Sequence, residues 1–188
     1  MPARDATTRE ASDLAFMRLA LEEARKAGEL GEVPIGGVVV HEGVVIACGH
    51  NRRELDADPS AHAEFTALLE ASRVLGHWRL TGCTVYVTLE PCLMCAGLMH
   101  QSRIDRCVFG ATDPKAGALG TLYAVHEDAR LNHRFEVTSG VCEQESAALL
   151  QDFFKGLRAD KDTRNQGESN GDKATQNTDP GSGAEEAV

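Results

Sequence analysis

The alternation of helix-type and strand-type segments constrains the fold of this chain more than any other feature of its sequence. Apolar residues at three- and four-residue spacing predict helices over Ser12–Ala27, from Asp58-Pro59 to Gly76, from Pro91 to about Gln101 and over Glu143–Leu157. Short β-branched runs predict strands over Gly36–Val40, Val44–Cys48, Thr84–Leu89, Cys107–Phe109 and Phe135–Thr138. This order predicts an α/β domain in which one sheet is covered by helices on both faces.

Glycine and proline mark the ends of these elements. Gly28 follows the first helix directly, and Pro59 stands where a helix accepts proline, at its first position. Glu42-Gly43 is a plausible tight turn, which would join the first two strands as a hairpin. The glycine-containing stretch Ala111–Thr121 is expected to be a loop.

The C-terminal part of the chain differs in composition from the rest. Residues 159–188 contain no Leu, Ile, Met, Phe, Tyr or Trp and are rich in acidic and small polar residues. Such a segment cannot bury enough apolar surface to offset the entropy lost on ordering. We therefore expect one domain over residues 1–158 and a disordered acidic tail over residues 159–188.

The charge of the chain argues at first against a nucleic-acid partner, because phosphates attract basic surfaces. The formal net charge is -10, of which the tail carries -4 and the predicted domain -6. The domain remains acidic, so any RNA surface requires its bases to gather on one face. The sequence has no apolar run long enough to span a membrane and no secretory signal pattern, and we expect a cytoplasmic protein.

Two cysteines open the helix that follows the strand Thr84–Leu89. Cys92 and Cys95 are three residues apart, so both thiols project from one face of the first helical turn. The positive end of the helix dipole favours the thiolate, which binds zinc or attacks a disulfide. A metal site and a thioredoxin-like redox pair are both open. Pro91 directly before Cys92, and a His-x-Glu sequence upstream, favour the metal.

His62 and Glu64 form that upstream sequence, at the expected start of a helix. A lone histidine there is more often structural, but beside two thiolates it becomes a natural third ligand. A Cys₂His set leaves one tetrahedral position open, as catalytic zinc sites do. Glu64 is a candidate proton carrier, although residues two apart on an ideal helix point about 200° away from each other. Spacing alone therefore does not bring Glu64 to the metal.

The two motifs together match a known signature. His62-Ala63-Glu64 followed by Pro91-Cys92-Leu93-Met94-Cys95 is the H-x-E then P-C-x-x-C pattern of zinc nucleobase deaminases. From about Leu14 to Leu157 the chain resembles the bacterial tRNA-specific adenosine deaminases. Further blocks carry this resemblance: Asn51-Arg52, Asp58-Pro59-Ser60-Ala61, Trp78-Arg79-Leu80, Tyr86-Val87-Thr88-Leu89-Glu90, Cys95-Ala96-Gly97, Ser102-Arg103-Ile104 and Asn132-His133-Arg134.

The resemblance implies a fold and a reaction. The fold is the three-layer α/β/α cytidine deaminase-like fold, with a central mixed sheet of about five strands. The reaction is the hydrolytic deamination of the wobble adenosine of tRNA, position 34, to inosine with release of ammonia. His62, Cys92 and Cys95 would hold one Zn²⁺ per subunit. Glu64 would deliver a proton to N1 of adenine and then to the departing amino group.

The resemblance also implies a partner and substrate contacts. The expected substrate is the anticodon stem-loop of an arginine tRNA, and the expected assembly is a homodimer. Asn51 would contact the base, Val33 and Ala63 would lie near the pocket, Lys115 would meet a phosphate and Phe154 would pack against an anticodon-loop base. Ordinary structural roles compete for several of these residues: a turn for Asn51, entry to a strand for Val33, a polar loop for Lys115 and half-buried core for Phe154.

Two other functions stay open at the level of sequence. A deaminase of free bases or nucleosides, such as guanine, cytosine or cytidine, would share the zinc machinery and differ in its pocket. A non-catalytic binding module would use the zinc only for stability. The blocks outside the zinc motifs favour tRNA, and the open metal position beside Glu64 speaks against the binding module.

Overall fold

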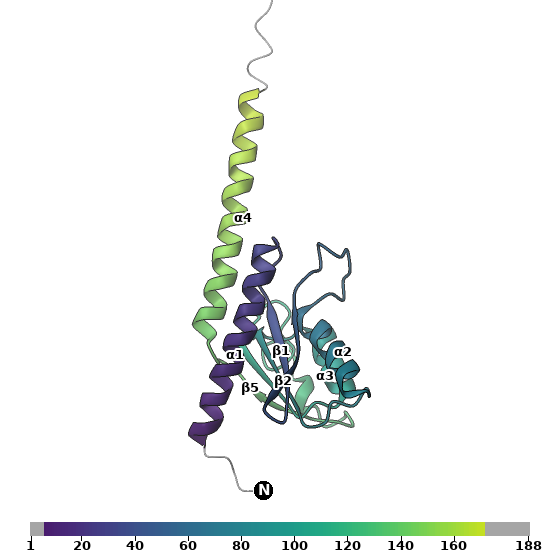
Figure 1. Ribbon diagram of the computed structural model, residues 1–188. Helices are drawn as coiled ribbons and strands as arrows, with labels where there is room; N and C mark the ends of the chain where they lie inside the picture. The colour runs from purple at the N-terminus through teal and green to yellow at the C-terminus, as the bar shows by residue number, and fades with distance from the viewer. Residues whose placement is uncertain (1–5, 172–188) are drawn as a thin grey trace, which may run out of the picture. The chain divides into compact units, whose positions relative to one another are not determined.

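A computed structural model describes residues 6–171 of the chain. It divides between Phe153 and Phe154 into two units. The elements along the chain are α1 (Ala6–Glu29), β1 (Gly36–His41), β2 (Val44–His50), α2 (Ala63–Leu75), β3 (Cys83–Leu89), α3 (Leu93–Ser102), β4 (Arg106–Ala111), the short 3-10 helix η1 (Val125–Glu127), β5 (Glu136–Thr138) and α4 (Glu143–Gly171) (Figure 1). The predicted order of helices and strands is confirmed, with η1 added.

The five strands form one mixed sheet in the order β2-β1-β3-β4-β5. β1 is antiparallel to both β2 and β3, whereas β3, β4 and β5 run parallel. The β1–β2 turn places Glu42 and Gly43 at φ 51° and 80°, as a two-residue hairpin turn requires. Because β1 is antiparallel to β2 and β3, and β3 is parallel to β4, the start of β1 and the end of β2 lie at the same edge of the sheet as the carboxyl ends of β3 and β4.

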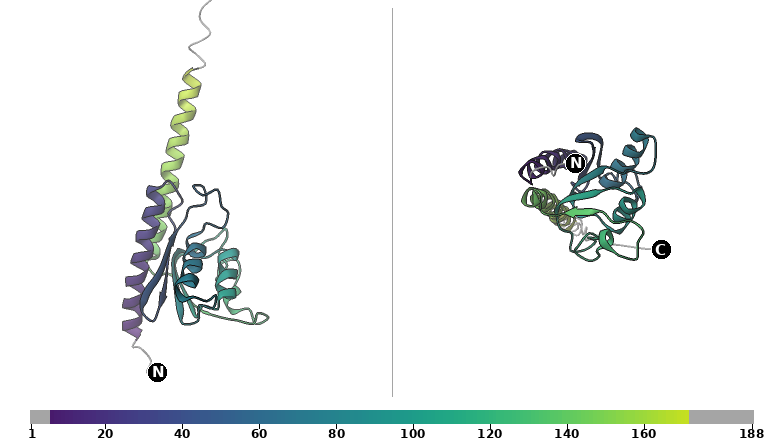
Figure 2. Two further views of the ribbon diagram at one scale, coloured as in Figure 1. Left: turned by 45° about the vertical axis from the view of Figure 1, so that its right-hand side comes forward. Right: turned by 90° about the horizontal axis from the view of Figure 1, so that it is seen from below.

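Helices cover both faces of this sheet (Figure 2). The larger core joins α2 and α3 to one face and includes Val39, Val85, Leu68 and Met99. The smaller core joins α1 to the opposite face through Met17, Val38, Tyr86 and Val108. Alternate residues of each strand thus enter different cores, as the pleat of a strand requires. The expected α/β/α fold with a central mixed sheet is confirmed.

The end of α1 differs from the prediction. The helix continues past Ala27 to Glu29, and Gly28 is not its cap. Gly31 instead adopts a left-handed φ of 81°, its N–H bonds to Gly28 O, and Glu32 N–H bonds to Ala27 O, each at 3.0 Å. These two bonds form a Schellman motif, which ends the helix with Gly31 in the left-handed conformation two residues after Glu29.

The start of α2 also differs from the prediction, which placed it at Asp58-Pro59. Asp58 Oδ1 accepts hydrogen bonds from both the N–H and the hydroxyl of Ser60, each at 2.7 Å, and so forms a separate turn. The helix begins only at Ala63, with His62 as an extended N-cap at φ -81° and ψ 151°. His62 therefore lies outside the helix that carries Glu64.

The last helix extends beyond the predicted end at Leu157. α4 runs to Gly171, so the first part of the segment expected to be disordered is helical in the structure. Helical hydrogen bonds are local, and a segment without large apolar residues can still form them. Residues 172–188 of the predicted tail lie outside the described residues. None of the described helices combines the length and the apolar character that crossing a bilayer requires.

Candidate active site

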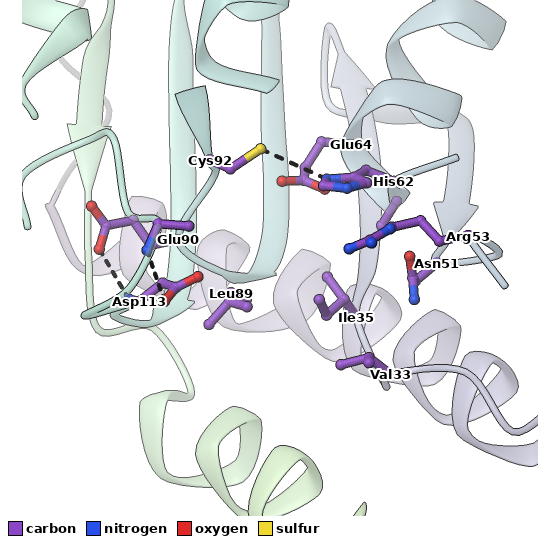
Figure 3. Close-up of a pocket in the computed structure, with 12 residues that line it drawn as sticks. Val33, Ile35, Asn51, Arg53, His62, Glu64, Leu89, Glu90, Cys92 and Asp113 are labelled. Carbon is purple, nitrogen blue, oxygen red and sulfur yellow. Dashed lines mark hydrogen bonds between the residues drawn. The ribbon is translucent and has the colours of Figure 1, made fainter. Parts of the chain in front are cut away.

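A cavity of about 190 Å³ opens at the sheet edge where β1 begins and β2, β3 and β4 end. Such an edge is the usual place for a ligand in an open α/β sheet. The lining comes from these ends of the strands, from the segments next to them and from the start of α2. The lining residues are Val33, Ile35, Asn51, Arg53, His62, Ala63, Glu64, Leu89, Glu90, Cys92, Asp113 and Ala116 (Figure 3).

His62, Cys92 and Cys95 converge beside this cavity. The Nδ1 atom of His62 lies 3.7 Å from Cys92 Sγ and 3.6 Å from Cys95 Sγ, and the three ligand atoms lie within 4.8 Å of one another. His62 is the N-cap of α2, while Cys92 is the N-cap of α3 and Cys95 lies in its first turn. The starts of two neighbouring helices therefore supply all three side chains.

The two thiols are electrostatically unequal. A hydrogen bond from Cys95, helped by His62, lowers the pKa of Cys92 to about 3. The pKa of Cys95 is raised, because its thiol donates to Cys92 and is buried near Glu64. The hydrogen bond to Cys92 also raises the pKa of His62. Cys92 therefore ionises more readily than Cys95, and binding of a metal ion would require both thiols to be deprotonated.

The donor set fits zinc. Two cysteine sulfurs and one imidazole nitrogen are among the ligands that Zn²⁺ prefers, and three protein ligands leave a tetrahedral position for water or substrate. His62 faces both sulfurs through the same nitrogen, as a shared ion would require. These three residues are also the group of possible metal ligands identified within the described part of the chain.

Glu64 lies on the first turn of α2 and lines the same cavity as His62 and Cys92 (Figure 3). Because His62 precedes the helix in an extended conformation, the 200° separation expected within a helix does not apply to this pair. Glu64 is only 4% exposed, and its burial raises the pKa of the carboxyl. A carboxyl with a raised pKa can hold a proton closer to neutral pH than an exposed one.

The residues predicted to bind substrate divide into two groups. Asn51, Val33 and Ala63 line the cavity, and Asn51 is buried, unlike an exposed turn residue. Lys115 stands between the lining residues Asp113 and Ala116 but is not itself part of the lining. Phe154 belongs to α4 in the second unit.

Several residues at the site did not stand out in the sequence. Arg53 lines the cavity together with Ile35 and Leu89. Glu90 is buried and accepts hydrogen bonds from Asp113 N, Leu119 N, Thr121 N and the Thr121 hydroxyl. The sequence signal that could have indicated such a structural role is the position of Glu90 between the end of β3 and Pro91, where the strand passes into α3.

Comparison with known proteins adds a family to this geometry. The model of the family described as MafB19-like deaminase matches residues 11–158. A tRNA-specific adenosine deaminase of Bacillus subtilis (strain 168) is 51% identical over 149 residues, which cover 79% of this chain and 92% of the relative. The tRNA-specific adenosine deaminase of Haemophilus influenzae is 45% identical over 157 residues, covering 83% and 91%.

Solved structures give the same picture. One from studies of A-to-I editing by tRNA:A34 deaminases at the wobble position has a TM-score of 0.70 and 47% sequence identity, covering 72% of this chain and 99% of the other. A guanine deaminase from Nitrosomonas europaea has a TM-score of 0.66 and 26% identity, covering 74% and 83%. The identity is thus higher to the relative that acts on tRNA than to this deaminase of a free base.

Proposed function

This chain belongs to the MafB19-like deaminase family, within which it groups with the tRNA-specific adenosine deaminases, and from that membership we propose that it deaminates the wobble adenosine of tRNA. Water and adenosine react to give inosine and ammonia. The observation that carries this function is the convergence of His62, Cys92, Cys95 and Glu64 at one cavity. The relatives at 51% and 45% identity support tRNA as the substrate.

We propose that His62, Cys92 and Cys95 hold one zinc ion per subunit. A zinc ion bound by these residues supplies Lewis-acid chemistry, because it lowers the pKa of water at its open position toward neutrality. The position of Cys92 and Cys95 at the start of α3 supports this assignment, since the helix dipole stabilises negative charge there.

Glu64 is the proposed proton carrier. It takes the proton that water loses and passes it to N1 of adenine, then takes the proton of the hydroxyl formed at C6 and delivers it to the amino group, which leaves as ammonia while C6 becomes a carbonyl. The burial that raises the pKa of Glu64 supports this role, because a carrier must accept and release its proton at the working pH. Its place in the cavity wall brings it to the same space as the metal ligands.

The rest of the proposed site binds the substrate. Asn51 contacts the base, and Val33 and Ala63 form part of the wall around it. Lys115, on a loop whose neighbours Asp113 and Ala116 line the cavity, meets a phosphate of the RNA. Phe154 packs against an anticodon-loop base, as aromatic side chains do with unstacked RNA bases.

We further propose a homodimer that acts on an arginine tRNA in the cytoplasm. Leu93 and Met94, between the two thiols on α3, are 48% and 36% exposed and offer apolar surface to a partner subunit. Light scattering of the purified protein tests the dimer, and a set of tRNA transcripts tests the arginine preference.

The decisive experiment compares substrates. Purified protein is incubated with an anticodon stem-loop carrying adenosine at the wobble position, and separately with free adenine, adenosine, guanine, cytosine and cytidine. Inosine in the stem-loop, with little product from the free compounds, supports the tRNA assignment. Deamination of guanine or cytosine with none of the stem-loop supports the alternative deaminase. Zinc binding without any deamination would point to the binding module.

A further inference from the structure

Glu32 is a buried acid that no part of the proposed reaction uses. It is the last residue of the Schellman motif that ends α1, and it is only 1% exposed. Its Oε2 atom accepts a hydrogen bond from Asn51 Nδ2 at 3.0 Å. Its Oε1 atom accepts hydrogen bonds from Glu54 N and Leu55 N, each at 2.8 Å. Both oxygens are thus occupied by N–H donors from the segment that contains Asn51.

This contact decides which way the Asn51 amide faces. An amide side chain has a donor end and an acceptor end, and its two orientations have nearly the same shape. A carboxylate only accepts, so the NH₂ group of Asn51 must face Glu32. In Figure 3 the amide oxygen lies on the side of His62 and the nitrogen on the opposite side. Asn51 therefore presents its amide oxygen, a hydrogen-bond acceptor, to the cavity. In the opposite orientation it would present its NH₂ group, a donor.

We propose that Glu32 is a positioning residue that determines substrate specificity by fixing the polarity of the Asn51 amide. This inference rests on the proposed function, because Asn51 must contact the substrate for its polarity to matter. Glu32 does not itself line the cavity. Glu32 therefore affects the reaction only through Asn51. The hydrogen bonds that it accepts from Glu54 N and Leu55 N hold the Asn51–Leu55 segment in place.

The substitution Glu32→Gln tests the mechanism because it changes hydrogen bonding with little change in shape. The glutamine oxygen keeps the two backbone bonds from Glu54 and Leu55 by facing them, and its NH₂ group then faces Asn51. Two donors cannot pair, so the Asn51 amide turns over and presents its NH₂ group to the cavity. We expect kcat/KM for the adenosine stem-loop to fall about 10- to 100-fold, as for the loss of one good base contact.

The control variants separate this role from a loss of stability. Glu29→Gln changes an exposed acid three residues away and should leave kcat/KM unchanged. Asn51→Ala removes the side chain through which Glu32 acts. In the Asn51→Ala background, Glu32→Gln should change kcat/KM by less than about twofold, the usual limit of additivity for uncoupled changes. A full Glu32→Gln effect in that background overturns the proposal.

Substrate analogues provide a readout that a merely structural role would not move. Stem-loops carrying 7-deazaadenosine, 3-deazaadenosine or 2′-deoxyadenosine at the target position each lack one polar atom of the substrate. Glu32→Gln should change the ratios of kcat/KM between these substrates and adenosine, whereas in the Asn51→Ala background the ratios should not depend on residue 32. A uniform loss on every substrate overturns the proposal.

A measurement on the wild-type protein needs neither activity nor a folded Glu32 variant. The side-chain amide signal of Asn51 is identified in ¹⁵N spectra by its disappearance in Asn51→Ala. We expect its protons to exchange with water much more slowly than those of an exposed asparagine. Exchange at the exposed rate would overturn the proposal. Inosine formation by the wild-type protein, assayed first, separates failure of this inference from failure of the proposed function.

Discussion

At the scale of single residues, the site depends on the extended N-cap at His62. The sequence placed His62 and Glu64 on one helix, where their side chains would diverge. The turn held by Asp58 keeps the residues before His62 out of the helix, so the helix starts at Ala63. The side chains of His62 and Glu64 therefore both reach the cavity. The candidate ligands were predictable because their chemistry is encoded in residue type and spacing. The orientation of Glu64 was not, because it depends on where a competing turn ends.

The roles proposed for Glu64 and for the metal ligands can be separated by substitution. Glu64→Gln keeps the shape of the side chain but cannot carry the proton, and we expect inosine formation to fall at least about 100-fold. The zinc content, measured by atomic absorption, should stay near one per chain, because Glu64 is not a proposed ligand. Glu70→Gln, on the exposed face of the same helix, is the control. Substantial activity in Glu64→Gln would contradict the assigned role.

Removal of the metal should destabilise the fold. A ligand present at 1,000 times its dissociation constant stabilises a protein by about 4 kcal/mol, which corresponds to a Tm shift of about 10 °C for a chain of this size. We therefore expect chelation, or Cys95→Ala, to lower the Tm measured by calorimetry by roughly this amount. Cys48→Ala, at an exposed cysteine outside the metal site, should bind zinc like the wild type. An unchanged Tm after complete chelation would argue against a bound metal in the native protein.

At the scale of elements, the loop after β4 is tied to the start of α3. Glu90 accepts its four hydrogen bonds from this loop, and Cys92 pairs with Gly117 through an isolated bridge. A Cβ on Gly117 would overlap the Glu90 carboxyl, so glycine is required there. The strands and helices were predictable from local periodicity. The roles of Glu32 and Glu90 were not, because their partners lie about 20 to 30 residues away in sequence.

We expect Glu90→Gln to loosen this loop without removing the metal. An amide has one accepting oxygen, so at least one of the N–H groups that now face Glu90 loses its partner, at a cost of about 1–3 kcal/mol. Limited proteolysis should cleave the Asp113–Thr121 loop faster, and KM for the stem-loop should rise while zinc content stays constant. Glu127→Gln, at an exposed acid of η1, is the matched control. A variant with the same KM and the same cleavage rate would show that the loop is held by other contacts.

At the scale of the whole molecule, one buried ion pair connects α1 to the sheet. Arg106 on β4 donates to both carboxylate oxygens of Asp13 at 2.7 Å, and the Tyr86 hydroxyl of β3 donates to Asp13 at 2.8 Å. Burial acts to raise the pKa of Asp13, but these hydrogen bonds and the charge of Arg106 outweigh it, and the pKa is lowered. Arg106 also donates to Thr138 of β5. This cluster joins the helix to three strands.

The lowered pKa of Asp13 predicts how stability depends on pH. Because its folded pKa lies below the unfolded value of 3.8, its contribution is present above that pH and is lost as the pH falls through the folded pKa. Asp13→Asn should lower the free energy of unfolding at pH 7 by about 3–5 kcal/mol, since Arg106 is then left buried without its partner. Urea unfolding between pH 2 and pH 7 measures both effects. If the free energy of unfolding of the wild type and that of Asp13→Asn fell equally below pH 4, this account would be contradicted.

The acidity of the molecule as a whole makes the local placement of its bases important for RNA binding. With a net charge of -10, a favourable interaction with phosphate must come from individual basic side chains near the cavity, such as Lys115. We expect Lys115→Ala to weaken stem-loop binding several-fold and to reduce the slope of log K against log salt by about 1. Arg73→Ala, at an exposed base on α2, should leave both unchanged. An unaltered salt slope in Lys115→Ala would remove this residue from the RNA surface.

The sheet topology also has a use in protein engineering. All segments that line the cavity meet at one edge of the sheet, whereas the turn of Glu42 and Gly43 lies at the other end of β1 and β2. Hairpin tips of this kind tolerate inserted sequence well. A short peptide tag or fluorophore-labelling sequence inserted between Glu42 and Gly43 should therefore leave stem-loop deamination close to wild type. This turn is an attachment point for immobilising the protein with its cavity facing the solution.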